Sequence, residues 1–326
     1  MKWGILGTGS IAGKFADTVN HMRQEGETLV CVGSRKLETA RAFADQWGIA
    51  EACGSYEDLA ANAQAEAVYI ATPNSLHYEN VRLCLEAGKH VLCEKPFTIN
   101  EKQAGQLYQL AEEKGLFLME AFWIRFLPIY EKLLEMIRQG QLGRIQCARS
   151  DYGFIAQGAR KDRKFNSDLG GGALLDIGVY NIGFMHMITG EEPEFFDSSC
   201  HINEYGTDDY STILMKYPSG CTAAISTSIG MEMPRRAAVF GTKGMVELED
   251  FQKAETMTVK IYGEEEYQVS LPFDINGFEY QIREASKCVA GGHCFSKVWT
   301  PNDCVGVMKF MENVRKSWGM KFAFEE

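Results

Sequence analysis

The chain lacks an uninterrupted hydrophobic run long enough to cross a membrane. Its longest apolar stretch, from Leu116 to Pro128, is broken by Glu120 and Arg125, whereas a membrane-spanning helix needs about 20 mostly apolar residues. Strand-like sequence starts at Lys2, with no charged and apolar leader before it. We therefore expect a protein that is neither exported nor inserted in a membrane.

An excess of positive charge and a spaced cysteine pattern are also missing. The net charge of -11 argues against nucleic-acid partners and anionic membranes, because both are bound by basic patches. The ten cysteines include no CxxC pair and lie mostly in apolar runs, as reduced, buried thiols do. We expect no nucleic-acid partner, no membrane partner and a cytoplasmic location.

Metal-ligand spacing is a third absence. No set of histidine, cysteine and carboxylate residues recurs at the intervals of a zinc site, and His293 and Cys294 are isolated neighbours. His186 lies on an apolar run and is expected in the core. We predict no metal centre.

What the sequence does contain is the pattern of two domains. The 326 residues, 45% of them hydrophobic, are enough for roughly two cores. Up to about Glu120, short apolar runs alternate with amphipathic helical stretches, which is typical of a parallel sheet covered by helices. We predict an α/β Rossmann domain over residues 1–120. Its expected strands are Lys2–Leu6, Thr28–Gly33, Ile49–Cys53, Ala67–Ala71, His90–Cys93 and Leu116–Glu120.

The pattern changes after Pro128. Strand-like runs now follow one another through short turns such as Pro218–Gly220, which favour antiparallel hairpins. We predict an α+β domain over residues 121–326 with a large, mostly antiparallel open sheet, a basic loop at Arg160–Lys164, and a helix after Gly170–Gly172. Its expected strands are Arg144–Phe154, Phe195–Tyr205, Tyr210–Tyr217, Cys221–Gly230, Ala237–Gly241, Met245–Leu248 and Thr256–Ile261.

A glycine-rich turn follows the first strand. The segment GTGSIA (Gly7–Ala12) matches GxGxxA between a strand and a helix, where glycines let the backbone approach a pyrophosphate and the helix N-terminus favours its charge. The predicted cofactor-binding residues here are Gly7, Thr8, Gly9, Ser10 and Ile11.

The end of the second strand indicates which cofactor binds. NAD enzymes normally carry Asp or Glu there for the ribose hydroxyl, but this chain reads Gly33, Ser34, Arg35, Lys36. Ser34 can donate to a 2′-phosphate and Arg35 can bind it with two hydrogen bonds. We therefore predict NADP(H), with NAD(H) as the alternative cofactor; alternatively, both residues simply begin the next helix.

Polar residues also follow the fourth and fifth strands. Ligands of an open parallel sheet bind outside the carboxyl ends of its strands, so Glu94 and Lys95 are expected beside the cofactor. After the fourth strand, the expected neighbours of the nicotinamide are Thr72, Pro73, Asn74 and His77. The alternative for this second group is an ordinary proline-asparagine turn.

Asp176 and Tyr180 lie four residues apart beyond the triple glycine, which places them on one helix face. A tyrosine near a lysine ammonium has a depressed pKa and can exchange a proton with a substrate oxygen, while a carboxylate one turn away orients either partner. Alternatively, Asp176 is a residue near the helix cap and Tyr180 a half-buried core aromatic.

Four motifs together resemble the glucose-fructose oxidoreductase (Gfo/Idh/MocA) family over essentially the whole chain. They are GxGxxA at the N-terminus, ATPNSLH (Ala71–His77), CEKP (Cys93–Pro96) and GGGALLDIGVY (Gly170–Tyr180). The segment MEAFWIRFLP (Met119–Pro128) and the tyrosine at position 180 are similar to its dimeric dihydrodiol dehydrogenase and sugar-oxidoreductase branch.

This resemblance implies a function and a set of residue roles. It implies an NADP-dependent oxidoreductase acting on a small polyol, sugar or cyclic trans-diol, with Lys95 and Tyr180 as the catalytic pair and Asp176 in support. Lining residues for the nicotinamide or the substrate would be Trp123, Arg125 and Phe126, although each could equally be interdomain packing. Two other functions remain open: an NADP-binding redox sensor without turnover, and a glycosidase that uses its nicotinamide as a transient oxidant.

The second domain is also expected to form a homodimer, as the resemblance implies for its open sheet. One face of the strand Cys221–Gly230 carries only small side chains, and a smooth sheet face of this kind must meet another surface. These side chains are Thr222, Ala224, Ser226 and Ser228.

Overall fold

The computed structural model describes residues 1–325, and the side chains of all of these except residues 158–161. The chain forms two compact units: Met1–Trp123 with Asp274–Val305, and Ile124–Phe273 with the chain from Gly306 onward. The predicted division into residues 1–120 and 121–326 placed Asp274–Val305 in the second domain. In the structure this segment belongs to the first unit.

Polar contacts explain why this C-terminal segment joins the first unit. The Ser286 hydroxyl donates to Glu27 over 2.6 Å, and Arg283 forms an ion pair with Glu25 at 2.8 Å. These partners lie more than 250 residues apart in the chain, so a local sequence pattern cannot reveal them.

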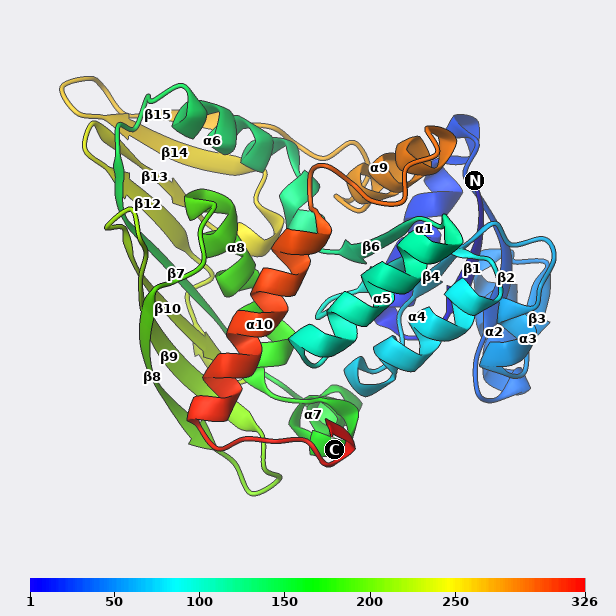
Figure 1. The fold of residues 1–326 in the computed structure, drawn as a ribbon. Coiled ribbons are helices and arrows are strands. Elements are labelled where there is room, and N and C mark those ends of the chain that lie inside the picture. The colour runs from blue at the N-terminus through cyan, green and yellow to red at the C-terminus, as the bar shows by residue number, and fades with distance from the viewer. Residues whose placement is uncertain (326) are drawn as a thin grey trace. The chain divides into compact units, whose positions relative to one another are not determined.

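Six parallel strands form the sheet of the first unit, in the spatial order β3-β2-β1-β4-β5-β6 (Figure 1). They are β1 (Lys2–Leu6), β2 (Thr28–Gly33), β3 (Glu51–Cys53), β4 (Ala67–Ile70), β5 (His90–Glu94) and β6 (Leu118–Ala121). This confirms the predicted Rossmann fold. The chain order reverses between β1 and β4, and in such sheets ligands bind at that point.

Helices connect these strands. They are α1 (Ser10–His21), α2 (Leu37–Trp47), α3 (Tyr56–Ala60), α4 (His77–Glu86) and α5 (Glu101–Lys114), with α9 (Glu279–Ala290) from the C-terminal segment and short 3-10 helices at Arg23–Glu25 and Asn74–Leu76. A further 3-10 helix, Trp123–Phe126, begins at the last residue of Met1–Trp123 and continues into the second unit. Asn100 caps α5 by accepting a hydrogen bond from the Gln103 amide, and Gly115 ends it in the left-handed conformation.

The second unit contains a mixed, mostly antiparallel nine-stranded sheet, as predicted. Its main path runs β15-β14-β13-β12-β7-β10-β9-β8, with β11 paired to β7, and β10 runs parallel to β7. The strands are β7 (Ile145–Ile155), β8 (Phe195–Ile202), β9 (Asp208–Lys216), β10 (Thr222–Ser228), β11 (Gly230–Met233), β12 (Ala237–Gly241), β13 (Gly244–Leu248), β14 (Thr256–Ile261) and β15 (Tyr267–Ser270).

Helices α6 and α8 lie on the same side of this sheet (Figure 1). The helices are α6 (Pro128–Arg138), α7 (Gly158–Phe165), a π-helical turn (Leu174–Gly178), α8 (Val179–Thr189) and α10 (Pro301–Ser317), with 3-10 helices at Ser167–Leu169, Phe251–Lys253 and Ala323–Glu325. Most of α8 is buried on every side, which is how a helix without a polar face packs in a core.

Three predictions for the second unit were wrong in detail. The basic loop expected at Arg160–Lys164 is part of helix α7, because the segment contains good helix formers and no proline; the side chains of Arg160 and Lys161 lie outside the described set. Strands β11 and β15 were not predicted. Ser228 is buried and its hydroxyl donates to the Asp209 carbonyl, so it is not part of an exposed face.

Two observations concern the predictions about membrane insertion and cysteine pairing. Among the described residues, no helix combines the length and the apolar composition that a membrane crossing requires. All ten cysteines have free thiols.

Candidate functional site

The loop between β1 and α1 exposes backbone rather than side chains. Gly7 has φ +114°, and a Cβ there would lie 2.6 Å from the Ala71 carbonyl oxygen, so only glycine fits. A Cβ on Gly9 would meet nothing within 4 Å in the described part of the chain. Gly9 is the N-cap of α1 and offers no side-chain acceptor to the first amides. Such an open helix N-terminus suits a phosphate group.

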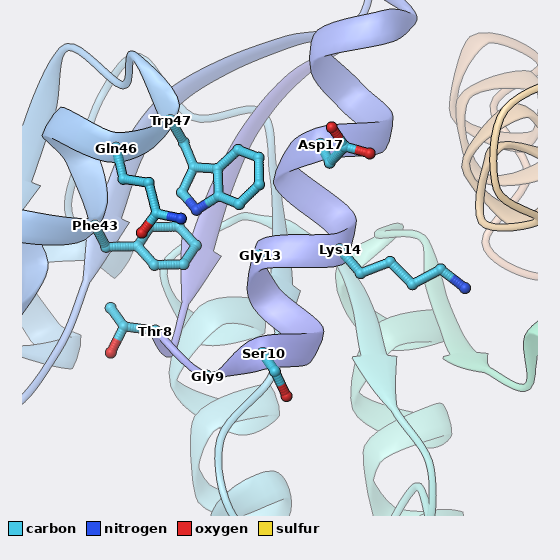
Figure 2. Close-up of a pocket in the computed structure, with 9 residues that line it drawn as sticks. All are labelled: Thr8, Gly9, Ser10, Gly13, Lys14, Asp17, Phe43, Gln46 and Trp47. Carbon is cyan, nitrogen blue, oxygen red and sulfur yellow. The ribbon is translucent and has the colours of Figure 1, made fainter.

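A pocket of about 430 Å³ adjoins this loop (Figure 2). It is lined by Thr8, Gly9, Ser10, Gly13, Lys14, Asp17, Phe43, Gln46 and Trp47. Figure 2 shows the three α2 side chains on one side of α1, with Lys14 extending from the other side. A Cβ on Gly13 would lie 3.2 Å from the Trp47 ring, so a small residue here lets α2 approach. The wall formed by α2 was not predicted from the sequence.

The residues directly after β2 are polar and basic, with no acid among them. Ser34 is half-buried, whereas Arg35 and Lys36 are exposed. Burial raises the pKa of the Tyr56 phenol, and the positive charge of the nearby Arg35 guanidinium partly opposes this rise. A cation therefore occupies the place where an NAD enzyme carries an acid.

The polar residues after β4 mostly hold neighbouring loops. Asn80 donates to the Thr72 hydroxyl over 3.0 Å, and Thr72 and Asn74 are buried. His77 is fully buried, with its ring nitrogens 2.8 Å from the Pro96 carbonyl oxygen and 3.0 Å from that of Thr72. His77 therefore connects the loops after β4 and β5. Pro73 is half-buried.

Glu94 and Lys95, adjacent in sequence, differ in environment. Glu94 is buried; it accepts hydrogen bonds from the Tyr69 hydroxyl and from the Lys95 amide at 3.3 Å. Burial raises the pKa of Glu94, and the Lys95 charge opposes this rise. Lys95 itself is half-buried, and its peptide bond to Pro96 is cis. Through these hydrogen bonds, the buried Glu94 side chain stabilises the end of β5.

Lys14 contacts aromatic rings that the sequence did not connect to it. Its ammonium lies 4.1 Å from the centre of the Trp123 ring and 4.2 Å from that of Phe278, and the two rings meet edge to face at 5.1 Å. Trp123 is thereby fixed within the first unit. In the second unit, Arg125 forms an ion pair with Glu131 at 3.1 Å.

Asp176 and Tyr180, which the spacing placed on one helix face, lie on two consecutive helical segments. Asp176 belongs to the π-helical turn and Tyr180 to the first turn of α8; π-helical turns occur frequently at functional sites. Both side chains are buried, with Tyr180 8% exposed. The Tyr180 ring lies 6.1 Å from that of Tyr152 on β7.

Two basic residues of α7 form ion pairs with Asp176. The Lys164 ammonium contacts its carboxylate, and Arg163 lies 3.5 Å from it. The Lys164 ammonium also lies 4.7 Å from the centre of the Phe154 ring. The sequence predicted basic residues in this segment but not their partner, because the pairing depends on how α7 packs.

The triple glycine allows the chain before Asp176 to turn tightly. A Cβ on Gly171 would lie 2.5 Å from the Lys164 carbonyl oxygen, and one on Gly172, which has φ +118°, would lie 2.3 Å from Asp208 Oδ1. Asp208 Oδ2 accepts a hydrogen bond from the Leu174 amide at 2.8 Å. Asp208 therefore caps the start of this helical segment from the neighbouring sheet.

The described residues contain no group of three or more His, Cys, Asp or Glu side chains that could hold a metal ion.

A parallel Rossmann sheet with an open helix N-terminus, joined to a second unit with a large mixed sheet, defines a dinucleotide-binding oxidoreductase. Residues 1–122 match the oxidoreductase family GFO_IDH_MocA with its NAD-binding Rossmann fold, and residues 130–247 match the GFO/IDH/MocA C-terminal domain. The chain belongs to the GFO/IDH/MocA family, which confirms the resemblance seen in the sequence motifs.

Named relatives resemble the chain over almost its entire length. The trans-1,2-dihydrobenzene-1,2-diol dehydrogenase of Mus musculus is 34% identical over 99% of this chain and 98% of that protein, and the Homo sapiens enzyme is 34% identical over the same shares. Among solved structures, the 3-ketoreductase KijD10 of Actinomadura kijaniata with NADP and TDP-benzene has a TM-score of 0.87 at 26% identity. The aldose-aldose oxidoreductase of Caulobacter crescentus with glycerol has a TM-score of 0.87 at 25% identity. Both alignments cover 97% of each chain.

We expect Asp208→Asn to reduce the pH dependence of stability. Burial raises the pKa of Asp208 to about 7, above the value of about 3.9 in an unfolded chain. Between these pKa values the folded protein binds the extra proton, so the free energy of unfolding falls as the pH rises, by up to about 4 kcal/mol. In the variant, urea midpoints at pH 5 and pH 8 should therefore differ less. Asp197→Asn on exposed β8 is the control; an unchanged pH dependence in Asp208→Asn contradicts this prediction.

Proposed function

We propose that the protein is an NADP-dependent oxidoreductase that moves hydride between the nicotinamide and a secondary alcohol or carbonyl. Its substrate would be a small polyol, a sugar or a cyclic trans-diol. The dihydrodiol dehydrogenases among the relatives support the diol, and the 3-ketoreductase and the aldose-aldose oxidoreductase support a sugar.

The cofactor proposal rests on the open loop and on the charge after β2. The amides of Gly7, Thr8, Gly9, Ser10 and Ile11 would hold the pyrophosphate, and Ser34 and Arg35 the 2′-phosphate. Residues proposed for the nicotinamide half are Thr72, Pro73, Asn74, Trp123 and Arg125. His77 and Glu94 were predicted to contact the cofactor. We propose that they instead hold the loops around the cofactor, because their polar atoms form hydrogen bonds with other residues of the first unit. Bound NADP(H) supplies the hydride chemistry.

Tyr180 is the proposed proton donor and acceptor. Its phenolic oxygen would exchange a proton with the substrate oxygen, and the Lys95 ammonium would favour the phenolate and bind a substrate hydroxyl. Asp176 would orient these groups. The observation that supports this most is the ion pairing of Asp176 with Lys164 and Arg163. A carboxylate without such partners would oppose ionisation of a tyrosine one turn away.

A screen of aldoses, ketoses, cyclitols and trans-diols tests the proposed activity. NADPH fluorescence should report turnover with at least one of these classes. Binding of NADP(H) without turnover on any of them would favour the redox sensor over the enzyme.

The open face of the second sheet is the proposed dimer surface. Leu214, Ala224, Arg149 and Ala238 lie in one cross-strand row, and Phe195 and Leu214 are 61% and 53% exposed. On β10 this face carries only small side chains, Thr222, Ala224 and Ser226, and exposed Arg149 of β7 lies directly beside Ala224. Exposed apolar side chains next to a strand of small residues suit contact with a second copy of the same sheet.

Arg35→Ala should weaken NADP binding selectively. The change removes a charged hydrogen bond to the 2′-phosphate, and we expect an affinity loss of roughly tenfold to a hundredfold. Affinity for NAD, which lacks this phosphate, should barely change. Arg41→Ala, on the exposed side of α2, is the matched control. Equal weakening of both cofactors, or of neither, would show that Arg35 does not select NADP.

Tyr180→Phe should abolish most turnover without disturbing the fold. It keeps the ring and deletes the hydroxyl, so kcat should fall by roughly 100-fold to 10,000-fold while NADP affinity remains. Lys95→Met should have at least as large an effect. Tyr217→Phe removes another buried hydroxyl of the same unit and controls for stability. Near-normal kcat in Tyr180→Phe, with chemistry rate-limiting, would refute its role.

Ala224→Arg should convert a dimer into a monomer. The new arginine would lie directly beside Arg149, so a sheet-to-sheet contact would have to bury two neighbouring positive charges. We expect light scattering at micromolar concentration to show a dimer for the unmodified protein, because an interface of standard size persists there. Glu113→Arg, on α5 of the first unit, is the control. A monomeric unmodified protein contradicts the proposal.

A further inference from the structure

The peptide group that follows Lys95 and Pro96 is held at both of its ends. His77 Nδ1 lies 2.8 Å from the Pro96 carbonyl oxygen, and the Phe97 amide donates to Glu120 Oε1 over 3.0 Å. This carbonyl and this amide belong to one peptide unit. A buried histidine therefore binds its oxygen while a buried glutamate binds its N–H.

The surroundings of His77 indicate its charge. The ring is 0% exposed, and its second nitrogen, Nε2, lies 3.0 Å from the Thr72 carbonyl oxygen. Carbonyl oxygens only accept hydrogen bonds, and a neutral imidazole has a single N–H to donate. A protonated ring would donate to both oxygens, whereas a neutral ring would donate to one of them and leave the other contact without a proton.

Glu120 binds the other end of this peptide with a buried carboxyl group. It is 0% exposed, and its Oε2 accepts a hydrogen bond from Trp299 Nε1 at 2.8 Å. Burial raises the pKa of Glu120 to about 7, opposed by the hydrogen bonds from Trp299, Cys304 and Phe97. The titratable groups facing it are Glu94 and Cys93 from β5, Tyr108 from α5 and Cys304 from α10.

We propose that His77 and Glu120 together are positioning residues for Lys95, because their buried side chains hold the two ends of the Pro96–Phe97 peptide. Hydrogen bonds at both ends of one peptide polarise it, so each bond strengthens the other. These bonds restrain the backbone immediately after Lys95, and with it the point from which the Lys95 side chain extends. This inference rests on the proposed function, in which Lys95 binds the substrate.

The charge of His77 is tested first, by a measurement that does not depend on activity. In protein labelled with ¹⁵N-histidine, both ring nitrogens of His77, assigned by their loss in His77→Gln, should resonate as protonated nitrogens at pH 8. His90 is an internal reference in the same spectrum, because its Nδ1 accepts a hydrogen bond from the Phe117 amide and burial lowers its pKa. An unprotonated His77 nitrogen at pH 8 overturns the proposal.

Kinetics test the positioning itself. Glu120→Gln and His77→Gln should each lower kcat roughly 10-fold to 100-fold, since small misplacements of a substrate-binding group are costly, with KM for NADP within about twofold. The double variant should lose less than the product of the two effects, because both side chains act on one peptide. Normal kcat in either single variant overturns the proposal.

Matched controls exist at the opposite end of the same sheet. Glu27 is also a buried carboxylate that accepts from a tryptophan, Trp3, at 2.6 Å, and it precedes β2. His90 is the first residue of β5, whereas Lys95 follows its last. Glu27→Gln and His90→Gln should alter thermal stability at most and leave kcat unchanged. A similar kcat loss in these controls would show that the effect is general destabilisation and would refute positioning.

Lys95→Met in the same series separates this inference from the proposed function. Full activity in Lys95→Met contradicts the proposed role of Lys95, and with it the proposed mechanism. If Lys95→Met loses activity while Glu120→Gln and His77→Gln keep a normal kcat, the positioning proposal is contradicted and the proposed role of Lys95 is not. Should His77→Gln fail to fold, the nitrogen spectrum of the unmodified protein, assigned by elimination among the six histidines, decides.

Discussion

The hydrogen-bond ladder of the parallel six-stranded sheet is the constraint on which the candidate cofactor site depends. Leu6 pairs with Ile70, and Ile70 pairs with Cys93, so β1, β4 and β5 end at the same edge. The loops that follow them therefore emerge together, although 85 or more residues separate the first from the last. Side chains buried on both faces hold this ladder, as in other parallel sheets.

Behind that edge the first unit buries two carboxyl groups, those of Glu94 and Glu120. Desolvation raises the pKa of Glu94 and of Glu120, which means that burial disfavours their charged forms. Apolar side chains would fill the same space at lower cost. Both carboxylates instead accept backbone hydrogen bonds on either side of Lys95, where a fixed chain direction has a use.

In the second unit, too, polar side chains from other elements support a candidate catalytic residue. Asp176 is paired with Lys164 and Arg163 from α7, and Asp208 caps the helical segment that carries it. In each unit a candidate catalytic side chain is thus supported by buried polar partners from other elements. Second-row contacts of this kind restrict rotamers and determine the electrostatic environment.

The sequence by itself determined the features that depend on neighbours a few positions away. The β1 turn, the absence of an acid after β2, the Asp176–Tyr180 spacing and most strands were predictable because periodicity and turn chemistry are local. Only the tertiary structure decided that Asp274–Val305 joins the first unit, that α7 supplies ion-pair partners, and that His77 and Glu120 meet at one peptide. These contacts join residues brought together by the packing of whole elements, and no local pattern encodes the partner of a buried charge.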